Sequence, residues 1–286
     1  MERADQLIYA KLLNVLREFG SVLVAFSGGV DSALLAKAAA AALGPAARAA
    51  VAVSPFFPAN ELRDARHLAA EIGIQLTEVE HAVLSEPSMS GNGPARCYHC
   101  KRNIFMELIH LAQRCQIRAV AEGSCADDAL EHRPGRRALR ELGIRSPLLE
   151  LGLFKADIRR LSFELGLPTW NKPSRSCLAT RFPYGVQLTR ESLQRVDAAE
   201  SLLISLGFAQ VRVRVHGEVV RIEAAPEDIS RLLSSELRGI VDVELRRLGY
   251  RFVAADLAGY RTGSFDTDGE HLQRDMIGQP TADNDQ

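Results

Sequence analysis

The sequence lacks an excess of charge of either sign, and it lacks any long hydrophobic segment. Its 35 lysines and arginines nearly balance its 36 aspartates and glutamates, which gives a formal net charge of −1. Without a global basic field, net charge does not indicate a nucleic-acid partner, although it leaves room for a local basic surface. No apolar run approaches the roughly 20 residues that a membrane-spanning helix needs. We therefore expect neither nucleic acid nor a membrane as a partner.

The start of the sequence and its cysteines both bear on the expected cellular compartment. Met1–Asp5 begins an amphipathic stretch rather than a basic start followed by an apolar core, so a cytoplasmic location is expected. The five cysteines are Cys97, Cys100, Cys115, Cys125 and Cys177. Their number is odd and their spacing irregular. In a reducing compartment this favours metal binding or catalysis over disulfides.

The first two-thirds of the chain alternates short β-branched runs with helical patterns, which is typical of a parallel sheet built from β–α–β units. We expect strands over 21–26, 49–53, 75–80 and 118–122, and helices over 32–43, 58–72, 104–115 and 155–165. From about residue 188 the pattern changes to helix, hairpin, helix and strand, over 189–206, 211–223, 226–233 and 251–256. The sequence thus predicts an α/β fold: a parallel-sheet domain (1–186), a smaller α+β domain (187–265) and a disordered tail (266–286).

The segment SGGVDS, residues 27–32, lies between the first expected strand and the first expected helix. Gly28 and Gly29 allow backbone N–H groups to approach an anion closely, and Ser27 and Ser32 add hydroxyl groups. The following helix would present free N–H groups and the positive end of its dipole. At the carboxyl end of a parallel strand, these features predict a cradle for pyrophosphate.

This loop lacks the lysine of a Walker A motif and instead resembles the S-G-G-x-D-S signature of PP-loop ATP pyrophosphatases. The resemblance implies adenylation of a substrate by ATP. Asp31 suits a Mg²⁺ ion between phosphates, or else it only caps the helix. Ser54 follows the second strand, where PP-loop enzymes seat adenine. Asp127 and Asp128, after the fourth strand, resemble a second acidic motif that would bind a metal, with an acidic turn as the alternative.

Two cysteine-containing segments are further candidates. Cys97-Tyr98-His99-Cys100 is a C-x-x-C pair without a second pair nearby, which is compatible with a metal half-site, a redox pair or coincidence. Cys177 lies in a polar segment with several prolines, over 173–185. We expect Arg175 and Arg181 to lower the pKa of its thiol and favour the thiolate.

Several motifs, in the same order over nearly the whole chain, resemble the LarE family: the loop at 27–32, CYHCKR, PSRSCLATRFPYG, RVRVHG and the D-L-x-G-Y-R-T-G-S run at 256–264. The resemblance implies an ATP-dependent sulfur transferase. Its expected substrate is pyridinium-3,5-biscarboxylic acid mononucleotide, whose carboxylates would become thiocarboxylates for the nickel-pincer nucleotide cofactor. It also implies a homo-oligomer, a hexamer.

The sequence leaves three interpretations of the cysteines, and they differ in the source of the sulfur. Cys97, Cys100 and Cys177 match the family members that carry three cysteines, so they would ligate a [4Fe-4S] cluster with one open iron for sulfide. Alternatively, Cys177 alone is a sacrificial sulfur donor. A third reading is zinc, with His99 or Cys125 as fourth ligand. Cys115 is expected in the core.

The resemblance also implies roles for residues near and beyond Cys177. Arg212 and Arg214 alternate on one strand face and would bind the substrate phosphate; the alternative is an exposed basic strand face. Glu200 would transfer protons near the reactive sulfur, or else it is a solvated residue. Arg181 would steady the acyl phosphate of the adenylate, with a surface ion pair as the alternative.

Three other functions remain as alternatives. A PP-loop tRNA thiolase would use the same adenylation, but the near-zero charge and the absence of an RNA-binding module argue against it. A GMP- or NAD-synthetase-like amidotransferase would leave the cysteines unexplained. A non-catalytic nucleotide-binding protein would hold ATP without releasing pyrophosphate.

Overall fold

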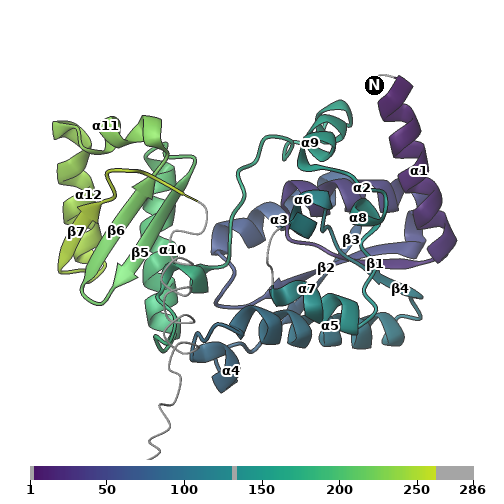
Figure 1. The fold of residues 1–286 in the computed structure, drawn as a ribbon, viewed down its shortest axis with the longest axis horizontal. Helices are drawn as coiled ribbons and strands as arrows, with labels where there is room; N and C mark the ends of the chain where they lie inside the picture. The colour runs from purple at the N-terminus through teal and green to yellow at the C-terminus, as the bar shows by residue number, and fades with distance from the viewer. Residues whose placement is uncertain (1–2, 131–133, 262–286) are drawn as a thin grey trace, which may run out of the picture. The chain divides into compact units, whose positions relative to one another are not determined.

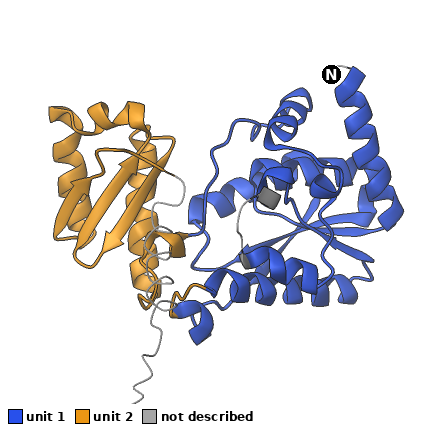
Figure 2. Cartoon of the chain, viewed as in Figure 1, with its two compact units in different colours: residues 1–90, 95–177 blue, residues 91–94, 178–286 orange. Residues whose placement is uncertain are grey.

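The chain forms two compact units in this computed structural model, which describes residues 3–130 and 134–261 (Figures 1 and 2). The described residues of 1–90 and 95–177 form the first unit, and those of 91–94 and 178–286 form the second. The tail expected over 266–286 and the last three residues of the 256–264 motif lie outside the described residues. In the described part of the chain, no helix is long and apolar enough to cross a membrane.

A sheet of four parallel strands forms the centre of the first unit. The strands are β1 (Val22–Ala25), β2 (Ala47–Val53), β3 (Gln75–Glu80) and β4 (Ala119–Ala121), in the order β3-β2-β1-β4. The α/β class expected from the alternating pattern is confirmed. In this order the connections reverse direction between β1 and β4, and open α/β sheets bind ligands at the carboxyl ends of the strands beside such a point.

Helices cover both faces of this sheet (Figure 1). The core on one face is built with α1 (Arg3–Phe19), α2 (Val30–Leu43), α3 (Ala59–Ile72) and α9 (Lys155–Glu164). The core on the other is built with α5 (Arg96–Arg114) and α7 (Pro134–Glu141). Strand β1 shows why both faces are apolar: Val22 and Val24 belong to the first core, and Leu23 to the second. Short helices α4 (Pro87–Ser90), α6 (Ala126–Leu130) and α8 (Pro147–Glu150) lie in the connections.

Two glycines allow the loops at the carboxyl end of the sheet to pack closely. Gly28 has a φ of +71°, and a Cβ there would lie 3.2 Å from Ala65 Cα on α3. A Cβ on Gly123, after β4, would lie 3.0 Å from the backbone nitrogen of Ser32. The loop after β1 is therefore held between α3 and the loop after β4.

The second unit packs helices against a three-stranded sheet. Strands β5 (Val211–His216) and β6 (Val219–Ala224) are antiparallel, and β7 (Phe252–Ala255) runs parallel to β6. Helix α10 (Arg190–Ser205) begins after Thr189, whose hydroxyl accepts the N–H of Ser192 as an N-cap. Helices α11 (Ile229–Leu232) and α12 (Ser235–Arg247) complete the unit. The smaller α+β arrangement expected after the nucleotide domain is confirmed.

Some boundaries differ from expectation. Helix α5 starts at Arg96 rather than 104, because its first turn, RCYHCK, is polar and hides the apolar period. The pair Cys97 and Cys100 is therefore helical. The helix expected over 226–233 is a 3₁₀ turn, η3 (Pro226–Asp228), followed by one turn of α11. Helix α12 was not expected; only Val241 and Leu245 of it are buried, so its sequence carries a weak amphipathic signal.

Candidate active site

The loop between β1 and α2 is fixed by its own hydroxyl groups. Ser27 and Ser32 are joined through their Oγ atoms at 3.1 Å, and Ser32 Oγ donates to the carbonyl of Gly29 over 3.2 Å. Gly29 is the N-cap of α2, and the first intrahelical bond runs from the N–H of Ala33 to its carbonyl. The N–H groups of Ser27 and Gly29 donate within the loop, to Ser32 Oγ over 3.2 Å and to Ser27 Oγ over 3.4 Å. The first N–H groups of α2 precede the first intrahelical bond, so they are the donors that the helix start offers to an anion.

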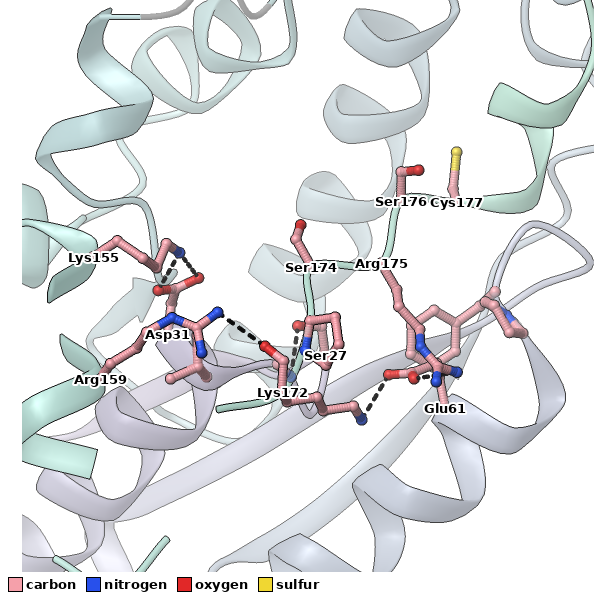
Figure 3. A pocket seen from close by; sticks show the side chains of 15 residues that line it. Ser27, Asp31, Glu61, Lys155, Arg159, Lys172, Ser174, Arg175, Ser176 and Cys177 are labelled. Carbon is pink, nitrogen blue, oxygen red and sulfur yellow. Dashed lines mark hydrogen bonds and ion pairs between the residues drawn. The ribbon is translucent and has the colours of Figure 1, made fainter. Parts of the chain in front are cut away.

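A cavity of about 420 Å³ opens in front of this loop (Figure 3). Its wall combines the loop, the start of α3, the start of α9 and the segment 172–177 that ends at Cys177. Six charged side chains line it: Lys155, Arg159, Lys172, Arg175, Asp31 and Glu61. Four cations against two carboxylates leave a net charge of +2 at neutral pH. A polyphosphate is the natural occupant of such a cavity.

Asp31 lies in this cavity beside a lysine. Lys155 Nζ donates to both carboxylate oxygens of Asp31, at 2.5 and 2.6 Å. Burial raises the pKa of Asp31; Lys155 opposes this and the charge of Asp128 adds to it. Asp128 accepts the N–H of Cys125 over 2.9 Å, and Asp127 accepts the N–H of Lys155 over 2.6 Å. The expected acidic residues therefore gather around the start of α9, and Asp127 helps to place Lys155.

Cys177 lines the cavity, and Cys97 and Cys100 lie close enough to it to interact electrostatically, although they are not among the lining residues. Arg96 is 3% exposed and donates from Nη1 to Cys177 Sγ over 3.2 Å. Burial raises the pKa of Cys100 to about 12, and the charges of Cys177 and Cys97 add to the effect while Arg96 opposes it. Cys97, Cys100 and Cys177 are thus within electrostatic range of one another. Among the residues that the structure describes, no three His, Cys, Asp or Glu side chains have metal-binding geometry.

A histidine borders these cysteines. His81 Nε2 lies 3.6 Å from Cys100 Sγ, and burial lowers the pKa of His81. Cys125 lies elsewhere, with its sulfur 3.4 Å from the carboxylate of Asp128. His99 packs edge-on against Tyr98. These contacts therefore do not direct Cys125 or His99, the two candidate fourth ligands for zinc, towards the three cysteines.

The cation that contacts Cys177 is not one that the sequence indicated. Arg175 forms an ion pair with Glu61, and Arg181 pairs with Glu200. Arg96 instead occupies the position beside the Cys177 sulfur that was expected for these two arginines. Burial alone would lower the pKa of Arg96, but the charges of the three cysteines and the hydrogen bond to Cys177 raise it above its ordinary value. Proximity along the chain pointed to Arg175 and Arg181, whereas the residue in contact comes from the start of α5.

In the second unit, the expected site residues form a buried polar group. Arg181 is 1% exposed and donates to both oxygens of Glu200, at 2.6 and 3.0 Å. Arg214 donates to Glu223 over 3.0 Å. Arg212 packs over the ring of Tyr260, 5.1 Å from its centroid. The alternatives of an exposed strand face, a solvated Glu200 and a surface ion pair are wrong, because all these side chains are buried; the proposed roles stay predictions.

Of the expected loop residues, Ser27, Gly29 and Asp31 line the cavity, whereas Gly28 and Ser32 are not among its lining residues. Sequence reasoning also missed several cavity residues. Lys155, Arg159, Lys172 and Glu61 line the cavity without having been expected. Lys172 had a usable signal, because it shares the short segment with Cys177. The others resemble ordinary surface charges at helix starts. Ser54 follows β2, and its Oγ accepts the N–H of Phe56 over 3.3 Å; it is not part of the cavity lining.

Comparison with known proteins is consistent with this site. The NAD synthase family model matches residues 8–95, which include the loop. Over 260 residues the chain is 41% identical to an uncharacterised protein of Synechocystis sp., covering 90% of this chain and 97% of that protein. Over 255 residues it is 39% identical to the pyridinium-3,5-bisthiocarboxylic acid mononucleotide synthase of Lactiplantibacillus plantarum, covering 89% and 92%. With this identity over nearly the full length of both proteins, the chain is an ATP-dependent PP-loop enzyme and belongs to the LarE family.

Proposed function

We propose that this enzyme adenylates the carboxylates of pyridinium-3,5-biscarboxylic acid mononucleotide and converts them to thiocarboxylates. The observation that carries the proposal is a single cavity whose wall runs from the nucleotide loop to Cys177. A nucleotide and a sulfur-bearing residue at one cavity are what a two-step reaction needs, because the adenylate must meet sulfur before water reaches it. The relative in Lactiplantibacillus plantarum, a synthase of the bisthiocarboxylic acid mononucleotide, supports the substrate.

In the first step, a carboxylate oxygen attacks the α-phosphorus of ATP. The bond between the α-phosphorus and the bridging oxygen breaks, and pyrophosphate leaves with both electrons. The helix start after Gly29 and the side chains of Lys155 and Arg159 would stabilise the charge that develops on the leaving group. Asp31 suits a Mg²⁺ ion there, since carboxylate and phosphate oxygens are the ligands that Mg²⁺ prefers, and the ion would supply charge neutralisation. Lys155 would then move from Asp31 to a phosphate.

In the second step, sulfur attacks the carbonyl carbon of the mixed anhydride and AMP leaves. Cys177 is the sulfur-bearing residue of the cavity wall, and Arg96 donates to its sulfur. Three thiols are the donor set of a [4Fe-4S] cluster with one open iron, so Cys97, Cys100 and Cys177 would hold it. Such a cluster would supply an exchangeable sulfide. Without it, Cys177 would form a thioester with the acyl group as AMP leaves. Loss of its Cα proton and cleavage of its Cβ–Sγ bond would then release the thiocarboxylate and leave dehydroalanine.

The second unit would hold the substrate phosphate. Arg212 and Arg214 lie on the same face of β5 and are buried next to carboxylates, as an anion site of fixed geometry requires. Burial lowers the pKa of Arg212 to about 10, with the charge of Arg181 adding to the effect, so an anionic phosphate nearby would favour its charged form. Glu200 would serve in proton transfer only after leaving Arg181, its partner in this structure.

The test combines two measurements on anaerobically purified protein. Pyrophosphate release that depends on the mononucleotide, with a thiocarboxylate product, is the expected result; ATP binding without release would indicate a non-catalytic binder. Iron and acid-labile sulfide distinguish the two sulfur sources. About four irons per chain, lost in Cys97→Ala, would support the cluster. Iron-free protein whose Cys177 peptide loses the elements of H₂S after one turnover would support the sacrificial cysteine.

A further inference from the structure

Two cations of the segment that ends at Cys177 share one carboxylate on α3. Lys172 Nζ lies 2.8 Å from Glu61 Oε2, and Arg175 Nη1 lies 3.0 Å from Glu61 Oε1 (Figure 3). All three side chains line the cavity. Glu61 is 4% exposed, so its charge is held away from water. A buried carboxylate is retained only if it is paired, and here the pairing fixes the segment to the helix.

The same helix supports the nucleotide loop. Ala65, one turn after Glu61 on α3, packs against Gly28 so closely that a Cβ on Gly28 would lie 3.1 Å from Ala65 Cβ. Lys172 Nζ also lies 3.5 Å from the carbonyl oxygen of Gly28. Glu61 thus stands where the loop, α3 and the segment 172–177 meet. A change in its charge would be transmitted to both the phosphate cradle and the segment that bears Cys177.

The charges and positions of Lys172, Arg175 and Glu61 allow this group to bind an anion. Of the three side chains that line the cavity here, two are cations and one is a buried carboxylate, so together they present a positive charge to it. Glu61 Oε1 accepts no aligned hydrogen bond, although Arg175 lies within ion-pair distance. Glu61 therefore holds both cations through their charge, and Arg175 keeps N–H groups that can donate to an occupant of the cavity. Guanidinium and ammonium groups together suit a phosphate beside Cys177.

We propose that Lys172 and Arg175 bind the nucleotide phosphate nearest to Cys177, and that Glu61 is the positioning residue that holds both cations for it. The inference rests on the proposed function in one respect: the phosphate is the one that links AMP to the substrate carboxylate in the adenylate. Its binding through these cations places the acyl carbon next to Cys177. Glu61 touches no substrate and acts through its two partners.

The test is calorimetric binding of α,β-methylene-ATP with Mg²⁺, an analogue that resists cleavage at the reacting bond. Lys172→Met and Arg175→Met should each weaken binding about tenfold, the loss typical of one charge-assisted contact. Glu61→Gln should also weaken it about tenfold, because two long side chains must then be ordered on binding. Asp64→Asn is the matched control. Asp64 lies 3.6 Å from Lys172 but its side chain is 50% exposed, so its loss should change affinity less than twofold.

A melting temperature for each variant separates positioning from a fold defect. Glu61→Gln that folds, binds more weakly and shows a steeper dependence of affinity on salt agrees with the inference, since its two cations are less neutralised. Unchanged or tighter binding in folded Glu61→Gln would overturn it, as would unchanged binding in both cation variants. The assay needs no mononucleotide. A chain that passes it but makes no thiocarboxylate would refute the proposed function and leave this inference standing.

Discussion

Arg96 donates a hydrogen bond to the sulfur of Cys177 across 3.2 Å and so joins the start of α5 to the end of the cavity wall. Its guanidinium is buried, with the ring of Phe56 5.8 Å away as a cation–π neighbour. A buried cation stabilises negative charge on the group that it contacts. Arg96 therefore helps to hold the Cys177 sulfur at the end of the cavity wall.

Replacement of Arg96 should uncouple sulfur transfer from adenylation. A hydrogen bond to a charged group contributes about 1.5–3 kcal/mol, so Arg96→Leu should slow thiocarboxylate formation about tenfold to a hundredfold. Pyrophosphate release should persist, because the nucleotide loop is not altered. The ratio of thiocarboxylate to pyrophosphate in a single turnover measures this. Arg114→Leu, at the exposed end of the same helix, is the control and should leave the ratio unchanged.

Gly28→Ala should abolish nucleotide binding. The residue has a φ of +71°, and its new Cβ would meet the backbone of α3 at Ala65. Gly73→Ala is a matched control, because Gly73 has a φ of +79° with nothing within 4 Å of its Cβ position. Both variants should lose about 1–2 kcal/mol of stability from the left-handed conformation. Only Gly28→Ala should lose affinity for Mg-ATP; equal affinity in the two variants would contradict the role of the loop.

The pair of Arg181 and Glu200 should be important for stability. Removal of one partner from a buried ion pair costs about 3–5 kcal/mol, because the other charge stays buried. Arg181→Met should therefore lower the free energy of unfolding in urea by this amount. The pair of Arg137 and Glu141 is exposed, so Arg137→Met should change the free energy of unfolding by only about 0–1 kcal/mol. A small effect of Arg181→Met would mean that water reaches Glu200.

The sequence was most informative where one short segment determines the structure. The loop at 27–32 specifies its own conformation through two glycines and two hydroxyls, and strand β3 has the bounds that its alternation predicted. Contacts between distant segments were not predictable. Arg96 and Cys177 are 81 residues apart, and only the packing of α5 on the sheet brings them together. Nearness in sequence favoured Arg175, whose side chain turns to Glu61 instead.

Most charged residues of the cavity were also not predicted, because their positions depend on contacts between distant segments. Lys155 is the first residue of α9, and nothing in the neighbouring sequence indicated that it would line the cavity. Asp127, in the first turn of α6, accepts its backbone N–H. A pattern in one helix reports which face is buried, but not which neighbouring element that face meets. Glu61 illustrates this: a carboxylate in the first turn of a helix is ordinary, and its burial depends on a segment more than a hundred residues later.

The central claim is that one cavity holds both the ATP that activates the substrate carboxylate and the residue, Cys177, through which sulfur reaches it. The most direct test incubates the protein with Mg-ATP and pyridinium-3,5-biscarboxylic acid mononucleotide, and follows pyrophosphate and the product by mass spectrometry. The account predicts pyrophosphate release only with the mononucleotide, and a product in which sulfur replaces a carboxylate oxygen; Cys177→Ala should retain the first and lose the second. Release that is independent of the mononucleotide, or thiocarboxylate formed by Cys177→Ala, would contradict it.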